Sequence, residues 1–263
     1  MTTQTARQLD TTELETRVKA MYTEVALAPN REFHFETGRR LAEHLGYPKA
    51  ELNAIPTEAI ESFAGVGYFL DLAAITPGET VLDLGSGSGT DSFLAAVATG
   101  PAGGVIGVDM TTAQLAKATR LADAAGIRNA SFLEGYIERP PVTPGSVDVI
   151  ISNGVINLSA DKPAVFRAAA AALRPGGRLV LADIVTARQL PEGVTCDASL
   201  WAACIGGAAQ RDDYLTMISH AGFDVETVRE NDYGFVSDRA VGATTTYGVT
   251  SLSLLARRRG TGP

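Results

Sequence analysis

Short apolar runs alternate along most of the chain with stretches whose apolar residues recur every three or four positions. After residue 79, the apolar runs predict buried strands at 80–84, 104–108, 130–134, 147–152 and 178–183. The amphipathic stretches predict helices at 90–99, 112–125, 161–173 and 211–221. Two later apolar runs predict closing strands at 225–229 and 249–256. This alternation is typical of an α/β fold with a mostly parallel sheet and helices on both faces.

The beginning of the chain follows the helical period alone. Its apolar residues predict a helix over 11–28, and shorter helical pieces follow before the turn at Pro77-Gly78. We therefore expect two parts. Residues 1–75 form a helical cap or lid, and residues 76–263 form the core, with an insertion at about 186–210 on the substrate side.

The composition narrows the possible partners. The 263 residues carry a net charge of −8 and an isoelectric point near 5.0, which argues against nucleic acid as the partner. No apolar run reaches the roughly 18 residues of a membrane span, and no apolar signal core begins the chain. Two cysteines, Cys196 and Cys204, are too few for a disulfide scaffold. We expect a cytoplasmic protein that acts on a small molecule without a metal, while the oligomeric state stays open.

The most informative motif is Val81-Leu-Asp-Leu-Gly-Ser-Gly-Ser-Gly89, a predicted strand that enters a glycine-rich turn. Its glycines let a ligand approach the backbone without meeting a Cβ atom. A helix follows, and the next strand ends at Asp109, 20 residues after Gly89, where a carboxylate can bind ribose hydroxyls. Together these features predict a nucleotide-binding unit.

The spacing of the glycines favours one nucleotide over another. Gly85, Gly87 and Gly89 form the pattern G-x-G-x-G, and Thr90 stands where a dinucleotide fingerprint has its third glycine. The shorter spacing, preceded by Asp83, favours S-adenosylmethionine over NAD. The charged amino acid end of that cofactor needs carboxylate and backbone partners. A nicotinamide oxidoreductase remains an alternative.

Ligands of open parallel sheets bind at the carboxyl ends of the strands, so the polar residues there are candidates. Cofactor-binding residues are predicted to be Asp83, Gly85, Ser86, Gly87, Asp109, Met110, Ile137, Glu138 and Asn153. Met110 and Ile137 would flank the adenine with apolar surface. Plainer readings remain for Met110 as core filler and for Glu138 as a solvated loop charge. Asp148, inside an apolar run, is expected to be structural.

Four segments carry a family resemblance: Val81–Gly89, Gly104–Met110, Val147–Ser159 and Cys204–Ala208. They resemble the arsenite methyltransferases, which belong to the class I S-adenosylmethionine-dependent methyltransferases. The first segment is generic to that class, whereas the motifs Ser-Asn-x-Val-Ile-Asn-Leu and Cys-Ile-Gly-Gly-Ala are more specific. The resemblance implies a Rossmann-like class I methyltransferase core with a C-terminal extension on the substrate side, to which we add the expected N-terminal helical cap. It also implies that the cofactor site is lined by Asp83, Gly85, Ser86, Asp109, Met110, Ile137 and Asn153.

The chain departs from that family at the positions that would bind arsenic. The family holds trivalent arsenic with the thiolates of several cysteines. One lies before the first strand, where this chain has the cysteine-free segment 61–67, and another follows Ser-Asn, where this chain has Gly154. Only Cys204 remains on the pattern, with Cys196 eight residues earlier. A single thiolate cannot form the chelate, and Gly154 would leave room for a bulkier organic acceptor.

The resemblance therefore predicts a methyltransferase that acts on a small organic molecule. Substrate-binding residues are predicted to be Phe35, Phe63, Gly154, Asn157 and Cys204. We predict that His34 or Tyr22 orients or deprotonates the acceptor. Methyl transfer needs alignment first, and a base only if the acceptor must lose a proton. Two alternatives stay open: metalloid methylation through Cys204 and Cys196, and a protein that binds S-adenosylmethionine without catalysis.

Overall fold

The computed structural model describes residues 9–33, 35–195, 201, 206–234, 242 and 245–260. Its strands form one sheet in the order β3-β2-β1-β4-β5-β8-β7, and β6 pairs with β5. The strands are β1 (Thr80–Leu84), β2 (Gly104–Asp109), β3 (Ala130–Glu134), β4 (Val147–Asn153), β5 (Leu173–Thr186), β6 (Ala209–Gln210), β7 (Phe223–Asn231) and β8 (Val249–Arg258). Strands β1 to β5 pair in parallel, and β8 is antiparallel to β5 and β7. The predicted α/β fold is therefore confirmed.

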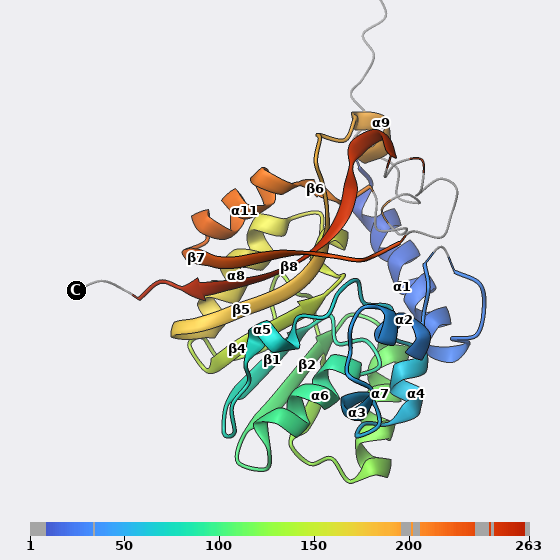
Figure 1. Ribbon diagram of the computed structural model, residues 1–263, viewed down its shortest axis with the longest axis vertical. Coiled ribbons are helices and arrows are strands. Elements are labelled where there is room, and N and C mark those ends of the chain that lie inside the picture. Colours follow the sequence, from blue (N-terminus) through green and yellow to red (C-terminus); the bar gives the residue numbers. More distant parts are fainter. Residues whose placement is uncertain are drawn as a thin grey trace, which may run out of the picture.

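Helices lie on both sides of this sheet (Figure 1). Those of the core are α6 (Thr90–Thr99), α7 (Thr112–Ala125), α8 (Lys162–Ala172), α9 (Glu192–Thr195) and α11 (Arg211–His220), with a 3-10 turn at Ile156–Leu158. Those before the sheet are α1 (Thr11–Leu27), α2 (Arg39–His44), α3 (Lys49–Leu52), α4 (Thr57–Glu61) and α5 (Leu70–Ala73). Figure 1 shows α1 to α4 gathered on one side, and both α1 and α4 contact α7. None of the described helices is long and apolar enough to cross a bilayer.

Successive residues of the central strands pack into different layers, as the pleat of a strand requires. Leu82 and Leu84 of β1 belong to the core that includes Phe166 of α8 and Tyr214 of α11. Val81 belongs to the core on the other face, together with Ala95 of α6. Because both faces are covered, β1 is apolar at nearly every position, and its one acid must find its partners at the carboxyl end.

Strand β5 is longer than the predicted 178–183. It begins at Leu173, and its pairing with β4 shifts register between Val147 and Val149. Its other end reaches Thr186 because β8 pairs with it along the whole stretch from Arg178 to Thr186. The apolar pattern locates the centre of such a strand, whereas its ends are set by the partner strand.

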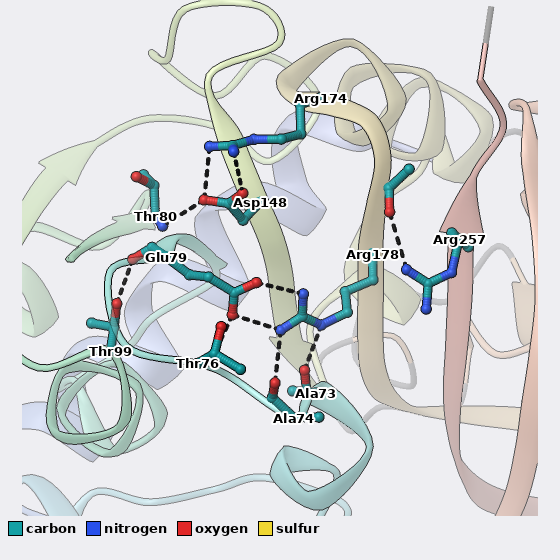
Figure 2. Close-up of polar contacts among 11 residues, drawn as sticks. Ala73, Ala74, Thr76, Glu79, Thr80, Thr99, Asp148, Arg174, Arg178 and Arg257 are labelled. Atoms are coloured by element: carbon teal, nitrogen blue, oxygen red, sulfur yellow. Dashed lines mark hydrogen bonds and ion pairs between the residues drawn. The ribbon is translucent and has the colours of Figure 1, made fainter.

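The segment that precedes the sheet is fastened at the amino ends of the strands. Arg178 of β5 donates hydrogen bonds to the carbonyl oxygens of Ala73 (2.5 Å) and Ala74 (3.0 Å) (Figure 2). The same guanidinium pairs with Glu79 at 2.7 Å. Asp148 lies nearby and accepts from the backbone N–H of Thr80 at 2.8 Å, which agrees with its expected structural role. These contacts fix the entry to β1 at the edge opposite the candidate site.

Candidate functional site

A cavity of about 250 Å³ opens where the strands β1, β2 and β4 end. Every residue predicted to bind the cofactor lines it, from the loop after β1 to Asn153 at the end of β4. The sequence had only strand order and residue type to place them. The parallel pairing of β1 with β2 and β4 brings their carboxyl ends to the same edge, as expected.

The glycine loop after β1 forms the floor of the cavity. Gly85 has a φ of 77° and Gly87 a φ of 52°, both in the left-handed region that glycine adopts without strain. The backbone N–H groups of Gly85 and Ser86 bond to the carbonyl oxygen of Val108 at 2.7 and 3.1 Å. The loop is thereby pinned to β2 and presents its backbone to the cavity.

Asp109 closes the loop from the end of β2. Its two carboxylate oxygens accept from the backbone N–H groups of Gly87 at 3.0 Å and Thr111 at 2.8 Å. Burial raises the pKa of Asp109 above its usual value, although these N–H donors oppose the shift. Each oxygen keeps a second lone pair that can accept from a ligand hydroxyl.

One polar atom on the floor has no hydrogen-bond partner in the part of the chain that the structure describes. The hydroxyl of Ser86 is buried, with 8 % of the side chain exposed, and its oxygen makes no hydrogen bond to the described residues. Buried polar groups are nearly always satisfied, so an orphaned hydroxyl on a cavity wall points to a ligand. These features fit S-adenosylmethionine. The glycine loop lets the ligand approach the backbone, Ser86 offers a free donor among the described residues, and Asp109 can accept from ribose hydroxyls.

Two further carboxylates lie beneath the loop. Burial, together with the neighbouring charge of Asp91, raises the pKa of Asp83 to about 8. The hydroxyl of Ser92 donates to Asp83 at 2.5 Å. Burial also raises the pKa of Asp91 to about 6, against the hydrogen bonds that it accepts. A cationic group of a ligand would favour the charged form of both carboxylates.

Sequence reasoning missed Asp91 and the residue that holds it. The hydroxyl of Tyr47 donates to Asp91 at 2.6 Å, and Asn153 donates to the same carboxylate at 3.1 Å. An acid in the first turn of a helix is common, and Tyr47 lies far away in a segment with no motif. The one available signal was the position of Asp91 directly after the glycine turn. It gave no reason to choose Tyr47 as its partner.

Asn153 serves the protein as well as the cavity. Its side-chain carbonyl accepts from the backbone N–H of Val66 at 2.7 Å, and its amide also donates to the hydroxyl of Tyr47 at 2.9 Å. The residue thus ties the loop after α4 to the end of β4. Its predicted cofactor contact stays a prediction.

Helix α1 supplies another part of the cavity wall. Leu14, Val18 and Tyr22 of this helix line the cavity. The amide of Gln114 in α7 donates to the carbonyl oxygen of Tyr22 at 2.9 Å, which holds the end of α1 against the core. Near the other end, the hydroxyl of Tyr136 donates to Glu15 at 2.6 Å. Tyr22 therefore lines the cavity, and its role toward the acceptor stays a prediction.

The predicted substrate residues are not all together. Phe63 lines the cavity, whereas Phe35 lies off the wall, with its ring 6.1 Å from that of Tyr22. Asn157 is fully buried in the 3-10 turn after β4 and does not line the cavity. Three predicted residues lie outside the described part of the chain: His34, Cys196 and Cys204.

The expectation that Gly154 leaves room beside the acceptor needs correction. Gly154 has a φ of 69°, and a Cβ atom on it would lie 3.1 Å from Cγ1 of Val66. Val66 is 1 % exposed and belongs to the segment in which the resembling family has a cysteine. The two positions therefore lie against each other, and the methyl groups of Val66 fill the space.

The sequence and the fold both match known proteins. A family model described as a methyltransferase domain matches residues 75–222. An arsenite methyltransferase of Halobacterium salinarum is 40 % identical over 205 residues, which cover 77 % of this chain and 52 % of that protein. The human arsenite methyltransferase is 36 % identical over 152 residues, 54 % of this chain and 40 % of that protein. The chain thus spans about half the length, or less, of these curated relatives.

Solved structures agree. The crystal structure of an arsenic(III) S-adenosylmethionine methyltransferase from Chlamydomonas reinhardtii superposes with a TM-score of 0.70 at 34 % identity, over 81 % of this chain and 74 % of that one. A geranyl diphosphate C-methyltransferase from Streptomyces coelicolor shares the fold, with a TM-score of 0.68 at 17 % identity, over 93 % of this chain and 98 % of that one. The chain belongs to the methyltransferase domain family, among class I S-adenosylmethionine-dependent methyltransferases that resemble the arsenite methyltransferases.

Proposed function

We propose that the protein transfers a methyl group from S-adenosylmethionine to a small organic molecule. The cofactor supplies a methyl group on a sulfonium, which makes that carbon electrophilic. The glycine loop and Asp109 would hold the nucleoside, and Asp83 with Asp91 would face the charged amino acid end. The protein's main task is then to align the acceptor with the methyl group and to exclude water, since displacement depends on approach geometry.

The packing of Val66 on Gly154 carries the choice of an organic acceptor. Arsenic(III) favours several thiolates, and one of the family's cysteines has its place at Gly154, while another lies in the segment 61–67 that contains Val66. Here the methyl groups of Val66 lie against a residue without a side chain, and neither residue lines the cavity. An arsenic(III) ion would therefore find neither thiolate ligands nor room beside Gly154 and Val66.

The rest of the acceptor wall also suits an organic molecule. Leu14 and Val18 from α1 and Phe63 from the loop after α4 give it an apolar surface. Tyr22 adds the one phenol among these groups and can orient an acceptor through a hydrogen bond. If the acceptor must lose a proton, Tyr22 and His34 stay the predicted candidates, and Tyr22 lines the cavity.

Labelled methyl transfer tests the proposal. The purified protein would be given isotope-labelled S-adenosylmethionine and, in separate tubes, arsenite with a thiol or a small-molecule extract of the host cell. Mass spectrometry would then identify the labelled products. A labelled organic product without methylarsenic is expected. Tight cofactor binding with no labelled product in either tube would instead favour a protein that binds S-adenosylmethionine without catalysis.

Metalloid methylation is the second candidate, and the 40 % identity to an arsenite methyltransferase favours it. It would have to depend on Cys204 and Cys196. Labelled methylarsenic from the first tube, lost in the variants Cys204→Ser and Cys196→Ser, would establish it. Arsenic methylation that survives both substitutions would exclude these thiolates as its ligands.

A further inference from the structure

We propose that the methyl acceptor is an uncharged or cationic molecule with an apolar body, and that the cavity rejects acceptors with a phosphate or carboxylate group. This inference rests on the proposed function and concerns the same site. It starts from the charges of the wall. Among the described residues, every Asp, Glu, Lys, Arg or His side chain that lines the cavity is a carboxylic acid: Glu15, Asp83, Asp91, Asp109 and Glu138. No lysine, arginine or histidine from the described ranges lines it.

The inner carboxylates are held by neutral donors. Asp109 accepts from two backbone N–H groups, Asp83 from the hydroxyl of Ser92, and Asp91 from Tyr47 and Asn153. None of these donors brings a positive charge, so these three carboxylates have no hydrogen-bonded protein cation to offset their charge when they ionise. The raised pKa of Asp83, to about 8, has the same origin, because burial and a neighbouring carboxylate disfavour its charged form.

Two lysines, Lys19 and Lys162, bind residues of the wall without lining the cavity themselves. Lys19 is paired with Glu15 at 2.7 Å, and its ammonium lies 5.1 Å from the ring centre of Tyr136. Lys162 is only 7 % exposed; its ammonium donates to the carbonyl oxygen of Ser159 at 2.9 Å. The same ammonium stacks over the ring of Trp201 at 4.7 Å. Neither lysine lines the cavity.

Lys117 follows the same pattern. Its ammonium donates to the hydroxyl of Ser62 at 2.8 Å and to the carbonyl oxygen of Ala26 at 3.1 Å. Ser62 lines the cavity, but Lys117 does not. An anion inside the cavity would therefore find no described ammonium or guanidinium to pair with.

The cofactor accounts for part of the negative wall, since it carries one net positive charge. The remaining carboxylates still repel an anion, and apolar side chains such as Leu158 and Val155 cannot replace its hydration. A like charge beside a buried carboxylate lowers affinity by about 100-fold or more. An uncharged apolar molecule loses little water, and a cationic one gains attraction.

Binding of a matched series of probes tests the inference apart from turnover. Naphthol, naphthylmethylamine and naphthyl phosphate share one apolar body and differ in charge. Their binding to the protein saturated with S-adenosylhomocysteine would be measured by calorimetry. We expect naphthol and naphthylmethylamine to bind at least about 100-fold more tightly than naphthyl phosphate. Equal or tighter binding of naphthyl phosphate would overturn the inference, and so would the failure of all three to bind.

Charge variants show whether the wall causes the ranking. Glu138→Gln removes one cavity carboxylate, and we expect it to narrow the gap between naphthol and naphthyl phosphate about tenfold. Glu134→Gln is the matched control, because Glu134 is exposed at the end of β3 and lies off the wall. An equal effect of both variants would refute the role of the wall. Failure of the proposed function is distinct: the probes would bind in the expected order, but no labelled product would form from any probe or extract.

Discussion

The hydroxyl of Tyr47 donates a 2.6 Å hydrogen bond to Asp91, and this bond joins the N-terminal segment to the first helix of the nucleotide-binding unit. Both side chains are buried, at 2 % and 7 % exposure. The carboxylate of Asp91 lines the cavity, whereas Tyr47 stands behind it. The position of a cavity-lining carboxylate therefore depends on a residue that lies outside every motif of the chain.

Tyr47→Phe is expected to lower the free energy of unfolding by about 1–3 kcal/mol, because a buried carboxylate loses the closer of its two side-chain donors. The pKa of Asp91 should rise further above about 6, since the lost bond favours its charged form. Denaturant titration measures the first effect. Tyr68→Phe is the control: Tyr68 packs its ring 4.9 Å from that of Tyr47 and is partly exposed. A similar loss in both variants would contradict the hydrogen-bond argument.

Ser86→Ala separates folding from binding. The hydroxyl has no partner among the described residues, so its removal should leave the free energy of unfolding within about 0.5 kcal/mol. Affinity for S-adenosylhomocysteine should fall by roughly 2- to 10-fold, the loss of one hydrogen bond to a ligand. Calorimetry and chemical unfolding of the same preparation check both. Unchanged affinity would mean that Ser86 does not contact the cofactor.

Asp83 should make the ligand-free protein less stable as the pH rises. Its pKa is about 8 in the folded protein, against about 4 in the unfolded chain, so folding takes up a proton between these values. The stability that this proton gives is complete below pH 4 and is lost as the pH rises through 8. Asp91 and Asp183, with pKa values of about 6, have finished most of their titration by pH 7.

Between pH 6.5 and 7.5, the free energy of unfolding should therefore fall less steeply with pH in Asp83→Asn, by up to about 1.4 kcal/mol per pH unit. Urea titrations at a series of pH values measure the two slopes, and other groups cancel in their difference. Parallel slopes for the two proteins would show that Asp83 titrates normally. Binding of S-adenosylmethionine should also release protons, because its cationic groups favour the charged carboxylate.

Tyr136→Phe tests whether α1 acts as a lid. The substitution removes the hydrogen bond to Glu15, one of the contacts that hold α1 over the cavity. Dissociation of S-adenosylhomocysteine should become roughly 2- to 5-fold faster, in keeping with a partly exposed contact. Stopped-flow displacement measures this rate. Glu13→Gln offers a matched control on the same helix, because Glu13 pairs only along the helix with Arg17. If neither variant changes the rate, α1 is a fixed wall.

Gly154→Ala is expected to destabilise the protein by about 1–3 kcal/mol, because of its left-handed φ and the 3.1 Å approach to Val66. Adding Val66→Ala should remove the destabilisation that comes from the steric contact and leave the destabilisation that comes from the left-handed backbone. A double-mutant cycle from unfolding data measures this coupling. Additive effects would show that Val66 does not obstruct a side chain at position 154.

The sequence was sufficient for the parallel sheet and for the floor of the cavity, because both follow from local patterns. Strand and helix periods fixed the alternation of elements, and the glycine spacing located Asp83 and Asp109 at one edge. The part of the cavity wall that α1 contributes follows no such local pattern. Leu14 and Val18 look like the apolar face of any amphipathic helix, and only tertiary packing shows that this face covers a cavity.

The error at Gly154 has a similar cause. A glycine suggests free space beside it, but a neighbouring side chain can fill that space, as Val66 does here. Val66 is distant in sequence, and its position depends on the bond between its own N–H and Asn153. Residue type alone could not show which side chain would occupy that corner.

The hydrogen bonds of Arg178 to the segment before β1 have an evolutionary consequence. It holds the main-chain oxygens of Ala73 and Ala74, and every residue type has such an oxygen. A foreign segment with different side chains could be joined at this point and still dock. The cavity-lining residues of α1 and of the loop after α4 lie upstream of the junction, and the glycine loop lies downstream. Recombination between related genes at this point could thus change substrate preference in one step and leave cofactor binding intact.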